Sequence, residues 1–202
     1  MSQAKTRTTA APWYGGRTDH DDPILHAIAQ WRVERPDLDA SPMAIFARIA
    51  RIFIFQRRAQ ATVHEQFGLS HAAFDMLANL RRSGAPHRKT ATSLAESSMI
   101  STGGVPFRMD GLEGAGLIRR VRDTDDRRVV HAELTEKGHA LIDQTMTAHV
   151  AMEHDILEGF SPRERQQLVK LLAKLEASLR SHLGRADGGT ADRTSDPDLR
   201  PE

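Results

Sequence analysis

The chain lacks cysteine altogether, and it lacks any long apolar run. Without cysteine there can be no disulfide, no cysteine-ligated zinc site and no thiol-based redox sensor. No apolar run approaches the roughly 18 residues that a membrane-spanning helix requires, and the polar N-terminus has no apolar segment typical of a secretory signal. We therefore expect a cytoplasmic protein that makes no use of a membrane.

Signatures of catalysis and of metal binding are also missing. The sequence has no Gly-x-Ser-x-Gly elbow, no Gly-x4-Gly-Lys phosphate loop and no paired carboxylates in a convincing context, which argues against an enzyme. Among the ten histidines, His149 and His154 stand five apart, off the i, i+4 spacing of two ligands on one helix face. Glu136 and His139 have no evident third ligand. We expect ordinary surface or hydrogen-bonded histidines, no metal and no cofactor.

Composition divides the chain into one domain and two tails. Residues 1–21 and 184–202 are polar and rich in glycine, threonine, proline or aspartate, and neither segment can bury enough apolar surface to offset its ordering entropy. Both are predicted to be disordered. Residues 22–183 remain as one compact domain, with no internal repeat.

Helix-start signals recur along this domain. Three of them combine a capping side chain with a proline suited to the first helical turn: Asp22-Pro23, Ser41-Pro42 and Ser161-Pro162. Glu164 follows Ser161 at the spacing of a capping box. Further N-caps are predicted at Ser70, Thr90 and Thr135. Apolar residues recur at helical spacing after each signal, so the domain is predicted to be mainly α-helical.

One stretch breaks the helical pattern. Residues 117–122 and 127–134 are rich in β-forming residues, and they flank the turn-forming run Asp123-Thr124-Asp125-Asp126. This arrangement predicts a β-hairpin. An isolated hairpin is marginal in water, so it must pack on helices or on a partner.

Three helices followed by a hairpin is the order of a winged helix-turn-helix. The short helix would begin at Thr90, and the next one would run to about residue 115 and stop at Gly116. On that second helix Val105, Met109 and Leu112 would face the core. The opposite face would carry Gly103, Phe107, Asp110 and Gly114, and in this architecture such a face enters the major groove.

The predicted lobe is the basic part of an otherwise balanced chain. Residues 81–133 hold ten Lys and Arg against seven Asp and Glu, and five of the ten lie on the hairpin. Cations clustered on a projecting hairpin suit phosphate contacts and minor-groove insertion. The alternative is a solvated strand pair with local ion pairs to the acidic turn.

Three sequence segments together resemble the MarR family of transcriptional regulators: Gly-Leu-Ile-Arg-Arg at 116–120, Asp-Thr-Asp-Asp-Arg-Arg at 123–128 and Leu-Thr-Glu-Lys-Gly at 134–138. The resemblance extends more weakly over about residues 40–182. It implies a homodimer whose first and last helices interlock and whose winged lobes read a palindromic operator in double-stranded DNA. It also implies a repressor that a small molecule, often phenolic or lipophilic, releases from DNA.

Carried over by position, the resemblance makes Arg127 and Arg128 the wing arginines and Asp126 the acid that steadies the wing. The full set of expected DNA-binding residues is Lys89, Thr90, Ser101, Thr102, Phe107, Arg108, Arg119, Arg127 and Arg128. The chain departs from the family where members commonly have polar residues, since it has Pro106, Phe107 and Gly111. These can offer a base only apolar contact, for example with thymine methyl groups.

The helical region outside the lobe, about residues 22–66 and 135–183 around a lobe at about 70–134, is predicted to form the dimer. The expected interface residues are Ile24, Ile28, Trp31, Leu168, Leu172, Leu175 and Leu179. An effector pocket is expected near His64, Phe67, His71 and Phe74, although aromatic residues at helical spacing are more often core. The alternative function is a winged-helix protein-interaction module without sequence-specific DNA binding, favoured by the weak Gly103-Gly104 helix start and by Phe107.

Overall fold

The computed structural model describes residues 22–97, 104–124 and 126–191, with side chains described to residue 185. These residues form a mainly α-helical winged helix-turn-helix, as predicted. Its helices and strands, in chain order, are α1 (Pro23–Glu34), α2 (Met43–Gln66), α3 (His71–Arg81), β1 (Arg88–Thr90), α4 (Ala91–Ser97), α5 (Val105–Gly114), β2 (Ile118–Arg122), β3 (Val130–Leu134), α6 (Glu136–Ile156) and α7 (Pro162–Ala191).

Most predicted caps are present in the structure. The side chains of Asp22, Ser70, Thr90 and Thr135 each accept a hydrogen bond from a backbone N–H in the first turn of the helix that follows. In the capping box, the backbone N–H of Ser161 donates to the Glu164 carboxylate at 2.8 Å, and the Glu164 N–H donates to Ser161 Oγ at 3.3 Å.

The predicted cap at Ser41 is wrong. Helix α2 begins at Met43 after Pro42 and has no side-chain cap. The Ser41 hydroxyl instead donates to Asp39 Oδ2 at 3.0 Å, and its backbone N–H donates to Asp39 Oδ1 at 2.9 Å. Because Asp39 occupies the hydroxyl in the preceding turn, that group does not reach the first turn of α2.

The predicted hairpin is part of a three-stranded antiparallel sheet in the order β1-β3-β2. Strand β3 begins at Val130 rather than at Arg127, because Asp126 O accepts from Val129 N at 2.9 Å and so extends the turn. Strand β1 was not predicted. It has three residues, Arg88–Thr90, which pair with residues 131–133 of β3, and a strand this short leaves no alternation to detect.

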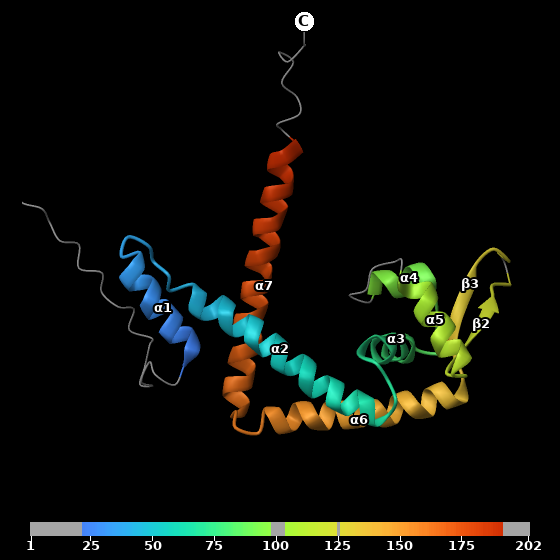
Figure 1. Cartoon of the computed structure of the whole chain (residues 1–202). Helices are drawn as coiled ribbons and strands as arrows, with labels where there is room; N and C mark the ends of the chain where they lie inside the picture. Colours follow the sequence, from blue (N-terminus) through green and yellow to red (C-terminus); the bar gives the residue numbers. More distant parts are fainter. Residues whose placement is uncertain (1–21, 98–103, 125, 192–202) are drawn as a thin grey trace, which may run out of the picture.

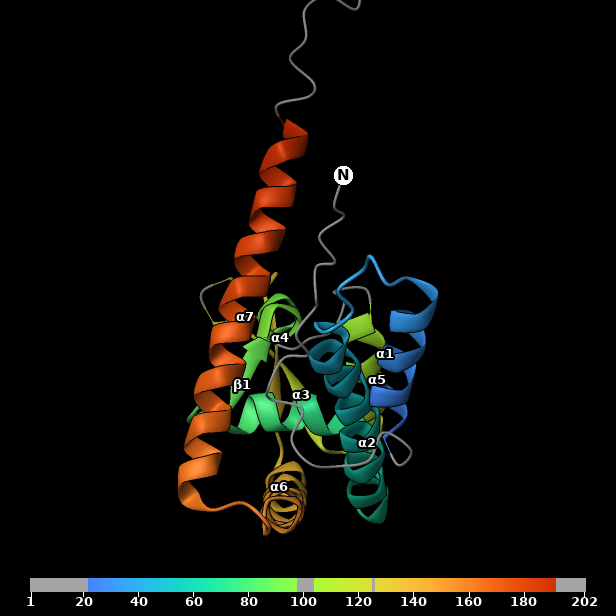
Figure 2. The same cartoon turned by 90° about the vertical axis from the view of Figure 1, so that its left-hand side faces the viewer.

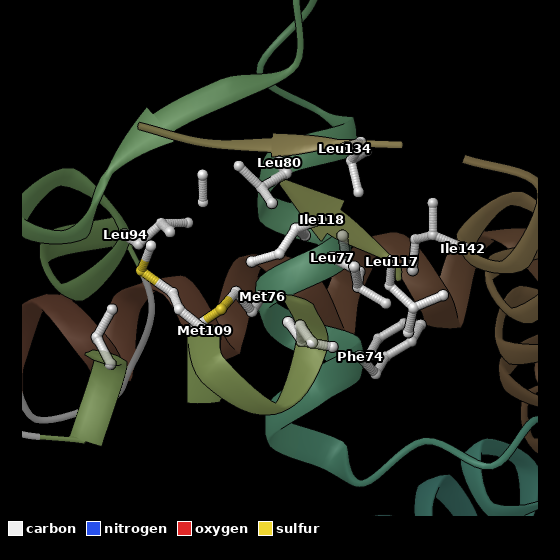
Figure 3. Close-up of a cluster of buried hydrophobic side chains, with 14 of the residues drawn as sticks. Phe74, Met76, Leu77, Leu80, Leu94, Met109, Leu117, Ile118, Leu134 and Ile142 are labelled. Carbon is white, nitrogen blue, oxygen red and sulfur yellow. The ribbon is translucent and has the colours of Figure 1, made fainter. Parts of the chain in front are cut away.

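The core of the lobe lies between α3, α4, α5, the sheet and the start of α6. Figure 3 shows apolar side chains converging from these elements, and Met76, Leu77, Leu80 and Leu94 are fully buried. The residues predicted to anchor α5 are buried as well, with exposed fractions of 1% for Val105, 3% for Met109 and 5% for Leu112. Helix α5 is therefore fixed to the lobe by one face only.

The remaining helices extend away from the lobe. Helix α6 runs beneath the lobe, and α7 rises from its far end (Figure 1). Although α2 and α7 cross in that view, they stand apart in Figure 2, with α7 on one side and α1 and α2 on the other. Helix α7 continues to Ala191, past Gly184, where the C-terminal tail was predicted to begin. None of the helices in the described ranges is long and apolar enough to cross a membrane.

Helices α1 and α2 form their own small core. Ile24 and Ile28 are 8% and 2% exposed and pack with Ala40 and Ala44 of the same chain. The structure thus corrects the prediction that these two isoleucines face a second copy, since the turn between α1 and α2 folds α2 back over them. Trp31, on the same face of α1, stays 44% exposed.

Candidate nucleic-acid interface

Helix α5 presents an exposed face with few polar groups. Pro106 lies in its first turn, where its missing N–H costs no helical hydrogen bond. The Phe107 side chain next to it is 81% exposed. Asp110, Gly111 and Gly114 complete the outward face. This is the face predicted to enter the major groove.

An arginine of the wing joins this helix to strand β2. The Arg120 guanidinium donates through Nη2 to Asp110 Oδ1 at 2.6 Å and through Nη1 to Glu113 Oε2 at 2.5 Å. The Arg120 backbone N–H also donates to Glu113 Oε1, at 3.1 Å. The hydrogen bond to Asp110 is the main reason that the pKa of Arg120 is raised. Both carboxylates of α5 are therefore neutralised from the wing side, which removes a charge that would repel phosphate.

The tip of the wing is held by a carboxylate. Asp126 accepts from Arg128 Nε at 3.1 Å, from Arg128 Nη2 at 3.0 Å and from the Arg128 backbone N–H at 3.0 Å. These hydrogen bonds, with the guanidinium first, lower the pKa of Asp126. The pairing fixes the turn but leaves the Arg128 side chain 91% exposed. Arg127 beside it is exposed and has no ion-pair partner among the described residues.

Another hairpin arginine is paired across the strands. Arg119 Nε donates to Glu133 Oε1 at 3.1 Å, and the two residues are opposite each other in the ladder between β2 and β3. The alternative of local ion pairs to the acidic turn therefore describes Arg128, through Asp126, whereas Arg119 and Arg120 pair with carboxylates outside that turn. Because the Arg119 side chain remains 66% exposed, its charge stays accessible.

The lysine expected to contact DNA is used inside the lobe. Lys89 Nζ donates to Asn79 Oδ1 at 2.7 Å and to Ser97 Oγ at 3.1 Å, which ties β1 to α3 and to the end of α4. Thr90 is likewise occupied as the N-cap of α4. Two of the three Lys89 N–H donors and an acceptor lone pair of Thr90 are thus used inside the lobe, and contact of these residues with DNA stays a prediction. Ser101 and Thr102 lie outside the described residues.

Arg108 folds back along its own helix. Its guanidinium lies so close to Gly104 that a Cβ added there would be 3.2 Å from Nη1, and this Nη1 is buried without a hydrogen-bond partner in the described structure. Arg108 also lines a cavity of about 690 Å³ between α5 and the first turn of α3. Gly68 and Ala72 line it on the α3 side, and Phe107, Asp110 and Gly111 of the outward face of α5 line it on the other.

The segment after the wing anchors the lobe to α6. Thr135 Oγ1 donates to Gly116 O at 2.8 Å, and Lys137 Nζ donates to Ala115 O at 2.8 Å. A Cβ at Gly138 would lie 2.0 Å from Leu117 O, so only glycine allows this approach. The Leu-Thr-Glu-Lys-Gly segment thus fixes the end of α5 to the start of α6.

Three of the four residues predicted to line an effector pocket lie in one stack of rings. The His64 ring is fully buried and lies with its centroid 4.0 Å from that of Phe74 and 5.6 Å from that of His71. His149 of α6 completes the stack, with its centroid 5.3 Å from that of His64. Phe67 instead packs, half-buried, against the lobe core. Sequence reasoning missed His149, although Ile142, Thr145 and His149 share the inward face of α6.

A hydrogen-bonded pair of histidines joins α2 to α6, and burial keeps the His64 ring neutral. His64 Nε2 lies 3.1 Å from His149 Nδ1, and His149 Nε2 lies 3.2 Å from Glu153 Oε1. Both contacts are satisfied when each Nε2 carries a proton and donates it. Burial, aided by the neighbouring histidines and Arg57, lowers the pKa of His64 from 6.5 to about 4. Among the described residues, no group of three or more potential ligands is placed to hold a metal ion.

Comparison with known proteins points in one direction. The sequence profile of the MarR family matches residues 69–130, the segment from the end of the α2–α3 turn to the start of β3. The HTH-type transcriptional regulator PecS of Dickeya dadantii (strain 3937) is 40% identical over 156 residues, which cover 77% of this chain and 94% of PecS.

Solved structures share the fold at lower identity. Sco3205, a MarR family transcriptional regulator from Streptomyces coelicolor solved in complex with DNA, superposes with a TM-score of 0.63 at 19% identity, covering 70% of this chain and 93% of Sco3205. Bordetella bronchiseptica BpsR, whose DNA binding is regulated by 6-hydroxynicotinic acid, gives a TM-score of 0.57 at 23% identity, covering 65% of this chain and 92% of BpsR.

Proposed function

Since this chain belongs to the MarR family of DNA-binding transcriptional regulators, we propose that it acts as a homodimeric repressor that a small molecule releases from a palindromic operator. A dimer bound at a promoter blocks access to the DNA beneath it, which is the simplest route to repression. The family alone leaves the dimer, the operator and the effector open. Each is argued below from the residues.

The proposed dimer follows from apolar side chains that this chain leaves uncovered. Leu168, Leu172 and Leu179 of α7 are 38%, 49% and 43% exposed, and they follow one stripe of a helix that stands apart from the rest of the chain. Ile52 and Phe53 of α2 are 61% and 60% exposed. Apolar surfaces of this extent are rare on monomers, and a second copy that places its α7 against α2 covers both.

The observation that carries the proposed DNA binding is the Arg120 bridge. It fixes the wing to α5, so that the exposed Arg127 and Arg128 and the outward face of α5 are presented to a duplex as one rigid unit. In a two-fold dimer two such units would stand one helical turn of DNA apart, about 34 Å, which requires a palindromic site. Phosphate contacts by the wing arginines would supply much of the affinity.

Selection of bound sequences from random duplex DNA, followed by salt titration on the selected site, tests this proposal. The wild-type chain is expected to enrich a palindrome and to lose affinity steeply with salt. The double variant Arg127→Ala, Arg128→Ala should bind at least tenfold more weakly, with a salt slope shallower by about 0.9 for each phosphate that an arginine no longer neutralises. The matched control Arg35→Ala removes an exposed cation from the end of α1 and should change neither quantity. Failure to enrich any sequence would favour the protein-interaction module instead.

We place the effector in the cavity of about 690 Å³ beside α5, rather than among the stacked rings of His64, His71 and Phe74, which fill their own space. The volume suits a small molecule, and the Arg108 guanidinium, which lines the cavity, would pair with a carboxylate group on the effector. Isothermal titration with 6-hydroxynicotinic acid probes the site. Ala72→Trp fills the cavity from α3 and is expected to abolish binding of this acid. Because Phe107, Asp110 and Gly111 also line the cavity, operator affinity of this variant is measured beside it.

A further inference from the structure

We propose that α5 reads bases by apolar contact, with Phe107 recognising the C5 methyl group of a thymine in the major groove. This inference rests on the proposed DNA-binding function and specifies the kind of base that this helix selects. It follows from the state of each side chain on the exposed face of α5.

The polar side chains of α5 are already engaged. Asp110 and Glu113 are both bound by Arg120 at 2.6 and 2.5 Å, which holds the two carboxylates toward strand β2 and compensates their charge. Arg108, the only cation on the helix, lies back over Gly104 with Nη1 buried. It therefore does not extend toward a guanine edge in this arrangement.

The rest of the exposed face carries no hydrogen-bonding side chain. Gly111 and Gly114 have none, and Pro106 has only its ring. Phe107 is the one large apolar side chain of α5 that is left mostly exposed, at 81%, and it also lines the cavity beside α3. A side chain this exposed contributes little to the lobe core, so its place on the helix is explained by what it meets outside the chain.

The major groove offers such a side chain one distinctive partner. Donors and acceptors mark every base there, and thymine alone among the four adds an apolar group, the C5 methyl. Gly111 and Gly114, where an added Cβ would meet nothing within 4 Å, let this part of the helix backbone approach the groove closely. The same methyl occurs in 5-methylcytosine, but a synthetic unmethylated library contains it only in thymine.

Replacement of thymine by deoxyuridine removes this methyl and nothing else. In the site selected by the full-length chain, each thymine is replaced in turn, symmetrically in both half-sites, and affinity is measured by fluorescence anisotropy. One position is expected to lose about fourfold per half-site, the effect of one buried methyl group, and so roughly 15-fold in all. Phe107→Ala should bind thymine and deoxyuridine sites equally, while Phe107→Leu, which keeps an apolar side chain, should still prefer thymine.

The results of this experiment distinguish failure of the proposed role of Phe107 from failure of the proposed DNA-binding function. Specific DNA binding that no deoxyuridine substitution weakens, or a methyl preference that persists in Phe107→Ala, overturns the role of Phe107 and leaves the regulator intact. Selective binding only to a library methylated at cytosine also overturns it, because thymine is then not the target. An absence of any specific DNA binding contradicts the proposed function itself.

Discussion

Because Gly138 has no side chain, α6 can begin in direct contact with the backbone that follows the recognition helix. The absent Cβ would stand 2.0 Å from Leu117 O, a backbone atom that cannot rotate away. The resemblance to a known family marked this glycine from sequence, but its reason is an approach between residues 21 positions apart, which no local pattern reveals. His149 shows the same limit, since its partner His64 lies on another helix.

Gly138→Ala should therefore destabilise the fold. Forcing α6 away from Leu117 is expected to cost about 3 kcal/mol in the free energy of unfolding, the upper range for an overpacked site. Urea denaturation at fixed protein concentration measures it. Gly184→Ala is the matched control: it lies in α7 with nothing within 4 Å of the added Cβ, and helix propensity predicts a gain of up to about 1 kcal/mol. Equal behaviour of the two variants would contradict the assigned contact.

His64 should make stability depend on pH. Its pKa is about 4 in the folded chain against an ordinary value of 6.5, so between these values the unfolded chain binds more protons. The contribution of neutral His64 to the free energy of unfolding is complete above pH 6.5 and is lost as the pH falls toward 4. Between pH 7.5 and 5 the loss from this group is about 2 kcal/mol per chain.

The variant His64→Phe keeps a ring stacked on Phe74 but removes the titrating group. The difference in unfolding free energy between pH 7.5 and pH 5 should then be smaller than in the wild type by about that amount. Urea unfolding at both pH values, at one protein concentration, measures this difference. An unchanged pH dependence would mean that His64 is not the titrating group.

At the scale of elements, the helices and the hairpin were predictable because their signals are local. Capping side chains at Asp22, Ser70 and Ser161 act within one turn of the helix they begin. Strand β1 could not be predicted from the sequence, because its three residues form a strand only by pairing with β3. The same distinction holds in the interface: the acidic turn identified the wing, whereas the engagement of Lys89 by Asn79 required the fold.

The union of wing and recognition helix depends on Arg120. Arg120→Ala is expected to lower operator affinity more than tenfold, because it frees two carboxylates on the face of α5 that meets DNA and loosens the wing. Combining it with Asp110→Asn and Glu113→Gln should recover part of the affinity by removing the repulsion. Anisotropy titrations of both variants test this. Affinity at the wild-type level in Arg120→Ala would show that the bridge has no role in DNA binding.

At the scale of the molecule, one chain is an incomplete structure. Helix α7 stands apart from the other described helices, and its leucine stripe is exposed (Figures 1 and 2). Helix α2 also has large exposed apolar side chains. The leucine spacing predicted this face, but the sequence alone also placed Ile24 and Ile28 there, which the fold covers within one chain. Which apolar stripe stays uncovered depends on tertiary packing.

The double variant Leu172→Glu, Leu179→Glu should therefore run as a monomer in sedimentation velocity at micromolar concentration, since burying four carboxylates in one interface is prohibitive. Lys170→Glu, on the opposite side of α7, changes charge without touching the stripe and should remain a dimer. A double variant that still sediments as a dimer would place the interface elsewhere.

Sedimentation velocity of the chain mixed with its selected, fluorescently labelled duplex tests the whole account most directly, because it reports partner number and DNA binding together. We expect one complex of two chains per duplex at moderate salt, which dissociates as salt is raised while the two chains stay together. Free duplex beside a lone chain at low salt would contradict both the pairing of subunits and the recognition of DNA.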